Sequence, residues 1–332
     1  MILIRQIKRY HPANFLILII IGLLAWFGTF LSKDTAGIYF DPDPMPIYRW
    51  IYSGIGGPNL ALLCKILGFV MVILQAILLN SITNQSNLLG FRSYLPGLFF
   101  VIITANFQEF QMLHPILFAN LFFLIAWERI SNIIEKSNAV TAYFNSAFFI
   151  GIASLFYPNY AYFLLIIALS TSLNRISHLR EFTMIALGFI TVWYFYLTIY
   201  FIFYNEFAFS GIDLNFSFGL DALKSLKPEQ LFFLSYVGFL LSLASFNLSL
   251  YMSNVKIQIR RNLKFLFSWF LAGFLLFIFT QSGIEIIYVI AAPISMLFAI
   301  FFLNIKNKWL SELAWFIIIG LTLINQFFTG LL

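Results

Sequence analysis

Long apolar runs, separated by short segments that carry almost all of the charge, constrain this chain more than any other feature of its sequence. Of its 332 residues, 61% are hydrophobic and only 10% are charged. A water-soluble domain carries roughly 25% charged residues, whereas about 20 consecutive apolar residues form a helix that crosses a bilayer. The pattern excludes a soluble domain and predicts an all-α fold, a polytopic bundle of membrane helices.

Eleven apolar runs are candidate transmembrane helices. The third to sixth are shorter than a bilayer crossing requires, so a pair within 94–127 or 139–173 could form a re-entrant hairpin instead. We expect a single membrane domain over residues 1–332, with larger loops at 33–58 and 205–229. The runs are 14–32, 59–80, 94–106, 115–127, 139–156, 159–173, 182–204, 230–252, 265–281, 286–303 and 313–330.

The basic residues sort to one side of these eleven spans. With the N-terminus in the cytoplasm, the cytoplasmic segments hold 14 Lys/Arg and 4 Asp/Glu, and the external segments hold 4 and 9. Lys and Arg in short loops mark the cytoplasmic side of a membrane protein. We therefore expect a multi-pass protein of the bacterial inner membrane with an external C-terminus.

The remaining composition limits the partners and the chemistry. The net charge of +6 follows from the cytoplasmic loops, where Lys and Arg meet anionic lipid headgroups, and does not indicate nucleic-acid binding. Cys64 is the single cysteine, so neither an internal disulfide nor a cysteine metal cluster can form. Motifs for binding nucleotides, for zinc proteases and for serine hydrolases are missing, and no cofactor is indicated.

Asp41 and Asp43, in the first external loop, are the leading candidates for catalysis. Each precedes a proline, which favours an extended backbone, and a carboxylate beside aromatic rings at the interface is a candidate general base. The pair is also a candidate site for a divalent cation. The alternative is a solvated turn, which Asp-Pro commonly starts. Arg49 follows closely and could bind a phosphate through two hydrogen bonds.

A short external turn carries the second group of candidates, Gln108, Glu109 and His114. About eight residues join the two apolar runs here, so these polar side chains are held near the membrane surface. Histidine exchanges protons near neutral pH, which favours acid–base chemistry for Glu109 and His114. The alternative is that both are ordinary interfacial turn residues.

Lys65 is the one charged residue within a predicted span. An ionisable residue inside the membrane is a candidate functional residue, although near a helix end its ammonium group can also extend to the headgroups. Together with Arg49 it is a candidate for binding a lipid-linked phosphate. Glu285 is a further external carboxylate, for which capping of a helix N-terminus is the simpler explanation.

The layout resembles the GT-C class of membrane glycosyltransferases over residues 1–205. In that class a first span leads to a large external loop with an essential aspartate, the place of Asp41 and Asp43. A short polar hairpin follows, as at Gln108 to Pro115, and then a Gly-rich hairpin with a proline-bearing turn, as in GIASLFYPNY at 151–160. The resemblance implies a polyprenyl-phosphate-linked sugar as donor, with Asp41 or Asp43 as the base.

The chain is also similar to an uncharacterised family of bacterial multi-pass inner-membrane proteins, which brings no activity with it. The similarity rests on NSITNQSNLLGFRSYLPGLFF, LHPILFANLFFLIAWERI and FIGIASLFYPNYAYFLL. Two alternatives to a glycosyltransferase therefore stand: a non-enzymatic membrane subunit that binds a partner protein of the cell envelope, and a transporter of lipids or solutes.

Overall fold

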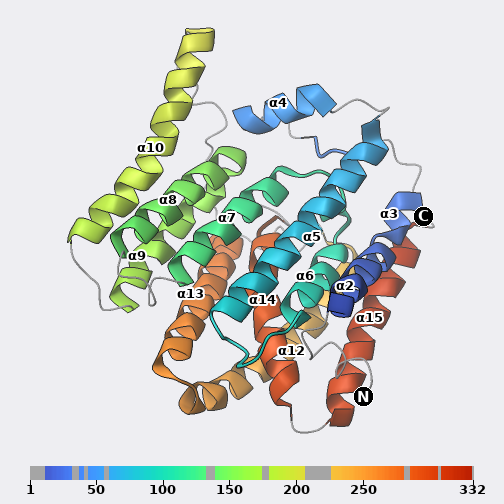
Figure 1. Cartoon of the computed structure of the whole chain (residues 1–332). Coiled ribbons are helices and arrows are strands. Elements are labelled where there is room, and N and C mark those ends of the chain that lie inside the picture. The colour runs from blue at the N-terminus through green and yellow to red at the C-terminus, as the bar shows by residue number, and fades with distance from the viewer. Residues whose placement is uncertain are drawn as a thin grey trace.

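The computed structural model describes residues 12–31, 37–40, 44–55, 60–131, 139–173, 179–205, 226–279, 285–305 and 308–330 (Figure 1). Within these ranges it consists of thirteen α-helices, short 3₁₀ turns and one isolated backbone bridge, and it contains no strand. The prediction of an all-α fold is confirmed. The main elements are α2 (Pro12–Ala25), α3 (Phe27–Leu31), α4 (Pro46–Ile55), α5 (Ala61–Gln85), α6 (Leu95–Ala105), η2 (Gln108–Phe110), α7 (Pro115–Ser131), α8 (Ala139–Phe156), η4 (Pro158–Phe163), α9 (Leu164–Leu173), α10 (Leu179–Tyr204), α12 (Pro228–Asn254), α13 (Ile257–Phe279), α14 (Glu285–Asn304) and α15 (Lys308–Gly330).

Four helices are long and apolar enough to cross a membrane, as judged by length and composition. They are Ala61–Gln85, Leu179–Phe203, Pro228–Ser253 and Glu285–Asn304. Several shorter apolar helices accompany them, among them Leu95–Ala105 and Val140–Phe156. The lengths and composition of these helices are those of a membrane protein. The number of spans and their orientation stay predictions.

Two of the apolar runs are not single α-helices. The run 14–32 is divided at Trp26, where α2 ends and α3 begins. The run 159–173 begins as the 3₁₀ turn η4, which starts at Pro158 and passes into α9. Proline has no backbone N–H and a fixed φ, so it suits the first position of a helical segment and interrupts a continuing one.

Two central helices, α6 and α14, are buried on all sides. Every residue of α6 is buried, and in α14 burial is continuous from Ile286 to Phe302. The ring of Phe99 in α6 lies 5.0 Å from that of Phe302 and 5.1 Å from that of Trp315. A helix that is hydrophobic all round belongs in the interior of a bundle. At 1.5 Å per residue α6 is about 16 Å long, well short of the roughly 30 Å of a hydrocarbon core.

A buried polar cluster joins four elements near the middle of the bundle. Gln75 Oε1 accepts hydrogen bonds from Asn120 Nδ2 at 2.7 Å and from the Tyr288 hydroxyl at 2.9 Å. The Tyr160 hydroxyl donates to Asn120 Oδ1 at 3.2 Å, and Gln75 Nε2 donates to the Leu117 carbonyl at 2.8 Å. Hydrogen bonds of this kind hold helices together where the surroundings are apolar. The cluster fixes α5, α7, η4 and α14 relative to one another.

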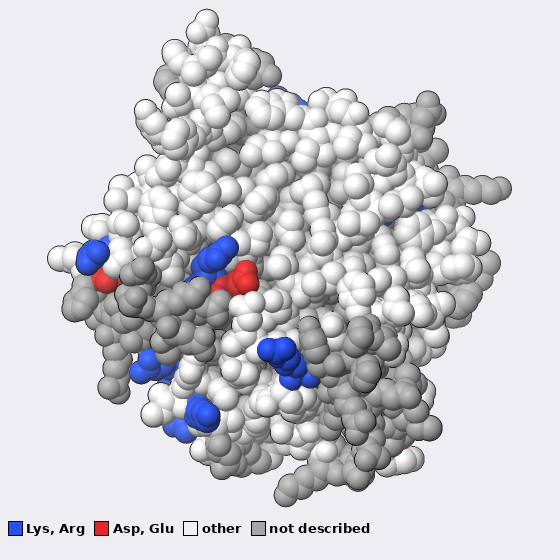
Figure 2. Space-filling view, in the orientation of Figure 1, with Lys and Arg blue, Asp and Glu red and all other residues white. Residues whose placement is uncertain are grey.

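Charged side chains are sparse over much of the described molecular surface. On the face shown in Figure 2, most of the visible Lys and Arg lie toward the lower left, and broad areas of the described surface are white. Large apolar side chains are exposed on α2 and α10, for example Leu16 at 60% and Ile202 at 70%. Such surfaces suit contact with lipid tails.

Candidate functional site

The turn between α6 and α7, residues 106–114 and called here the His114 turn, is held against the segment 37–40. The Tyr39 N–H donates to the Leu113 carbonyl at 3.0 Å, and the Leu113 N–H donates to the Gly37 carbonyl at 2.9 Å. The buried hydroxyl of Tyr48 is 2.7 Å from the Tyr39 carbonyl and 3.0 Å from that of Leu113. Together these hydrogen bonds connect the His114 turn to the segment 37–40 and to α4.

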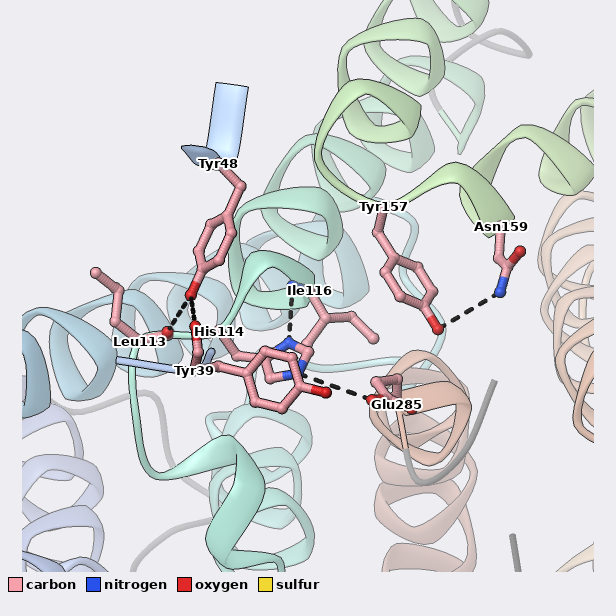
Figure 3. Close-up of polar contacts among 8 residues, drawn as sticks. All are labelled: Tyr39, Tyr48, Leu113, His114, Ile116, Tyr157, Asn159 and Glu285. Carbon is pink, nitrogen blue, oxygen red and sulfur yellow. Dashed lines mark hydrogen bonds and ion pairs between the residues drawn. The ribbon is translucent and has the colours of Figure 1, made fainter. Parts of the chain in front are cut away.

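His114 lies at the end of this turn and is 1% exposed. Its Nδ1 accepts a hydrogen bond from the Ile116 N–H at 3.2 Å, so the proton of the neutral ring is on Nε2. That Nε2 is 3.9 Å from Glu285 Oε1 and has no hydrogen-bond partner among the described residues. The Tyr39 ring packs on the imidazole with 4.1 Å between centroids (Figure 3). His114 therefore presents a buried donor toward a carboxylate that it does not reach.

Burial lowers the pKa of His114 from 6.5 to about 3, because the charged imidazolium loses its hydration in the bundle. The residue is neutral at physiological pH, and its contact with Glu285 joins a neutral ring to a carboxylate. This differs from the sequence-based expectation of a histidine that exchanges protons near neutral pH. Desolvation, which depends on the packing of α4, α6 and α14 around the turn, is the physical reason.

Glu285 opens α14 and is 21% exposed at its side chain. An acidic residue is favoured in the first turn of a helix, so capping and a role in the site are compatible. The junction of α8 and η4, residues 157–159 and called here the Tyr157 turn, supplies Tyr157, whose hydroxyl accepts a hydrogen bond from Asn159 Nδ2 at 3.4 Å. Figure 3 shows how the His114 turn, the start of α14 and the Tyr157 turn approach one another.

Gln108 and Glu109 lie on the 3₁₀ turn η2, within the His114 turn. Gln108 Oε1 accepts a hydrogen bond from Lys227 Nζ at 3.1 Å, which connects the turn to the start of α12. Glu109 is half-buried, and its Oε2 has no hydrogen-bond partner in the part of the chain that is described. Both residues are thus placed at the same end of the bundle as His114.

Lys65 lies buried in α5, at 4% exposure, rather than extended toward solvent. Its Nζ donates to the Thr29 carbonyl at 3.0 Å. The Thr29 hydroxyl is hydrogen-bonded to Gln111 Oε1, and Gln111 Nε2 donates in turn to the Ala105 carbonyl at 2.5 Å. Lys65 therefore supports α3 and the base of the His114 turn.

Arg49 occupies a different environment from Lys65. It is exposed on α4. Two residues earlier in the same helix, Ile47 packs against a cluster of Leu155, Val192 and Tyr196 from α8 and α10. The Lys65 ammonium contacts the Thr29 carbonyl of α3, whereas Arg49 lies on α4. The hypothesis that the two cations together bind a donor phosphate remains a prediction.

Asp41 and Asp43 lie outside the described residues. The chain on either side is well anchored: the Phe40 ring packs on that of Tyr52 at 5.9 Å, and Met45 is buried and accepts a hydrogen bond from the Arg49 N–H at 2.9 Å. Among the described residues no group of three or more His, Cys, Asp or Glu could hold a metal ion. A divalent cation at Asp41 and Asp43 therefore stays a prediction.

Sequence reasoning did not identify Tyr39, Tyr157 or Asn159 as parts of this site. A signal for the last two was present, since both belong to the proline-bearing turn of GIASLFYPNY. A search of protein-family models, of curated proteins and of solved structures gives no match to the chain. The function proposed below therefore rests on the geometry of the site.

Proposed function

We propose that the chain forms eleven spans in the bacterial inner membrane, with a cytoplasmic N-terminus and the His114 turn on the outer side. Side-chain contacts join segments to which the charge pattern assigns the same side. On the outer side Lys227 contacts Gln108 and Gln326 contacts Ala105, the latter at 2.7 Å. On the inner side the Tyr251 hydroxyl donates to the Leu88 carbonyl at 2.9 Å. This agreement over distant segments supports the proposed alternation of the spans, and the excess of Lys and Arg in the inner loops assigns that side to the cytoplasm.

The proposed activity is transfer of a sugar from a polyprenyl-phosphate donor, as in GT-C-like glycosyltransferases. The observation that carries the proposal is the buried Nε2–H of His114, 3.9 Å from Glu285 Oε1. A donor and an acceptor so placed suit a hydroxyl group, whose oxygen accepts from His114 while its proton is donated to the carboxylate. Acceptor sugars and polyols offer such hydroxyls.

In the proposed reaction the acceptor oxygen forms a bond to the anomeric carbon of the donor sugar. The bond from that carbon to the phosphate oxygen breaks, and polyprenyl phosphate leaves with the electron pair. The hydroxyl proton passes to a carboxylate, either Glu285 or one of Asp41 and Asp43. General-base catalysis by a placed carboxylate contributes about 10²–10⁴ in rate. Exclusion of water around His114 would limit hydrolysis of the donor.

The test is sugar transfer by the full chain in proteoliposomes, with a radiolabelled polyprenyl-phosphate sugar and a panel of acceptors. We expect Glu285→Gln, or else Asp41→Asn or Asp43→Asn, to lower turnover by about 10²–10⁴. His114→Leu should raise the KM for the acceptor because it removes the hydroxyl's donor. Glu229→Gln is the matched control, since Glu229 is also an acid in the first turn of a helix that starts on the outer side.

Equal turnover in the wild type and in all four site variants would overturn the assignment of these residues. A wild-type protein that transfers no sugar, and whose Glu285→Gln variant disturbs an envelope assembly in cells, would instead favour the non-enzymatic subunit. Altered solute uptake without transfer would favour a transporter.

A further inference from the structure

A pocket of about 340 Å³ opens at the end of the bundle opposite the His114 turn. Gly68, early in α5, lies against the backbone of Met112 in the His114 turn, and Asn84 follows it about 24 Å further along the same helix. The proposed orientation puts this end on the cytoplasmic side. The pocket is lined by Phe15, Ile77, Asn80, Ser81, Asn84, Gln85, Arg92 and Tyr94.

Two amide side chains in the lining are oriented by the backbone. Asn80 Oδ1 accepts the Gly97 N–H at 2.7 Å, and Asn84 Oδ1 accepts the Ser93 N–H at 2.9 Å. Both amide oxygens already accept a hydrogen bond, so each side chain has only its NH₂ group left to donate one. Asn80 Nδ2 is buried and has no hydrogen-bond partner among the described residues. Because this group packs against Gly97 of α6, the half-buried Asn84 supplies the amide donor that faces a ligand in the pocket.

The lining combines these donors with a positive charge. Arg92 provides a guanidinium, which pairs well with phosphate oxygens. Glu128 lies beside the lining, where its Oε1 accepts a hydrogen bond from Nε2 of the lining residue Gln85 at 3.3 Å. A cation with amide donors selects an anion rich in acceptor oxygens. Phe15 and Ile77 add an apolar wall, which suits the glycerol and upper acyl region of a lipid.

We infer that this pocket binds a phosphate group, either the headgroup of an anionic phospholipid in the cytoplasmic leaflet or a soluble phosphate ester. Its volume lies at the lower end of the range for small-molecule sites and accommodates a glycerophosphate headgroup rather than a whole lipid. The inference is independent of the activity proposed for the outer side, because the two places share no residue.

The experiment uses the full chain in nanodiscs of phosphatidylcholine, with fluorescent phosphatidic acid as the probe. Asn84→Asp is the sharpest variant, since it keeps the oxygen that accepts from Ser93 and replaces the NH₂ group by a charged oxygen that repels phosphate. We expect Asn84→Asp and Arg92→Gln each to weaken binding about ten- to a hundredfold, the loss typical of a hydrogen bond to a charged group. Arg180→Gln removes an exposed cation from the start of α10 and should bind as the wild type does.

Competition separates the two sources of phosphate. Displacement of the probe by unlabelled phosphatidylglycerol, but not by millimolar glycerol 3-phosphate, would support a lipid headgroup. Displacement by both would support a soluble phosphate ester. Equal binding by the wild type and both pocket variants, or equal binding of fluorescent phosphatidylcholine, would overturn the inference.

Discussion

At the scale of single residues, His114 links the folded state to pH. Its pKa is lowered from 6.5 to about 3 in the folded protein, so the unfolded chain takes up a proton below pH 6.5 that the folded chain excludes. The stability is therefore complete above about pH 6.5 and falls as the pH is lowered toward 3, by up to about 1.4 kcal/mol per pH unit.

This effect can be measured by thermal unfolding in detergent. Between pH 7.5 and pH 5 we expect His114 to remove up to about 2 kcal/mol from the free energy of unfolding. The variant His114→Gln should lack that part of the pH dependence. The other two histidines, His11 and His178, remain in both proteins and cancel in the comparison. Identical pH profiles for the two proteins would contradict the prediction.

The sequence predicts individual polar positions better than their surroundings. His114, Glu109 and Lys65 stand out because charged and titratable residues are rare in apolar runs. Their burial could not be predicted, because it depends on segments far away in the chain: α4 covers the His114 turn, and Thr29 of α3 receives the Lys65 ammonium. The proximity of Glu285 to His114 likewise arises only once α14 is inserted.

At the scale of elements, small residues let α8 and α10 pack closely. A Cβ at Gly188 would lie 2.4 Å from the backbone carbonyl oxygen of Phe144, whereas a Cβ at Gly238 in α12 would meet nothing within 4 Å. Backbone cannot move aside as the tip of a side chain can. Helices in membranes rely on such close approach, because lipid tails are as apolar as the packed side chains.

The pair Gly188→Ala and Gly238→Ala tests this packing with the same chemical change. We expect Gly188→Ala to lower the free energy of unfolding by about 1–3 kcal/mol, the usual cost of overpacking. Gly238→Ala should be neutral or stabilising by up to about 1 kcal/mol, because alanine is the better helix former. Unfolding in mixed micelles with increasing SDS measures both. A smaller loss for Gly188→Ala than for Gly238→Ala would refute the proposed contact.

Apolar runs predict where helices form but not which of them face lipid. The runs 94–106 and 286–303 became α6 and α14, with boundaries within a few residues. Both helices are buried. The helix α10 has a similarly apolar composition, but only 22% of its apolar window is buried. Protein interior and lipid are equally apolar, so hydrophobicity alone does not distinguish the two surroundings.

At the scale of the whole molecule, the proposed orientation can be tested with cysteine labelling. Cys64 is the only cysteine and is buried, so Cys64→Ala gives a background without thiols. In that background we expect Lys227→Cys to react with a membrane-impermeant maleimide in spheroplasts. Arg180→Cys should react only after permeabilisation. Both positions are exposed, and the reverse labelling pattern would overturn the proposed orientation.

The central position of α14 has a consequence for how the chain is made. This helix is the next to last of the elements in order of synthesis, yet it fills the middle of the bundle and contacts α6, synthesised far earlier, through pairs such as Phe99 and Phe298 at 5.7 Å. Until α14 leaves the ribosome, α6 must rest against lipid or against a membrane insertase. The bundle can therefore close only late, around a helix that arrives after most of its neighbours.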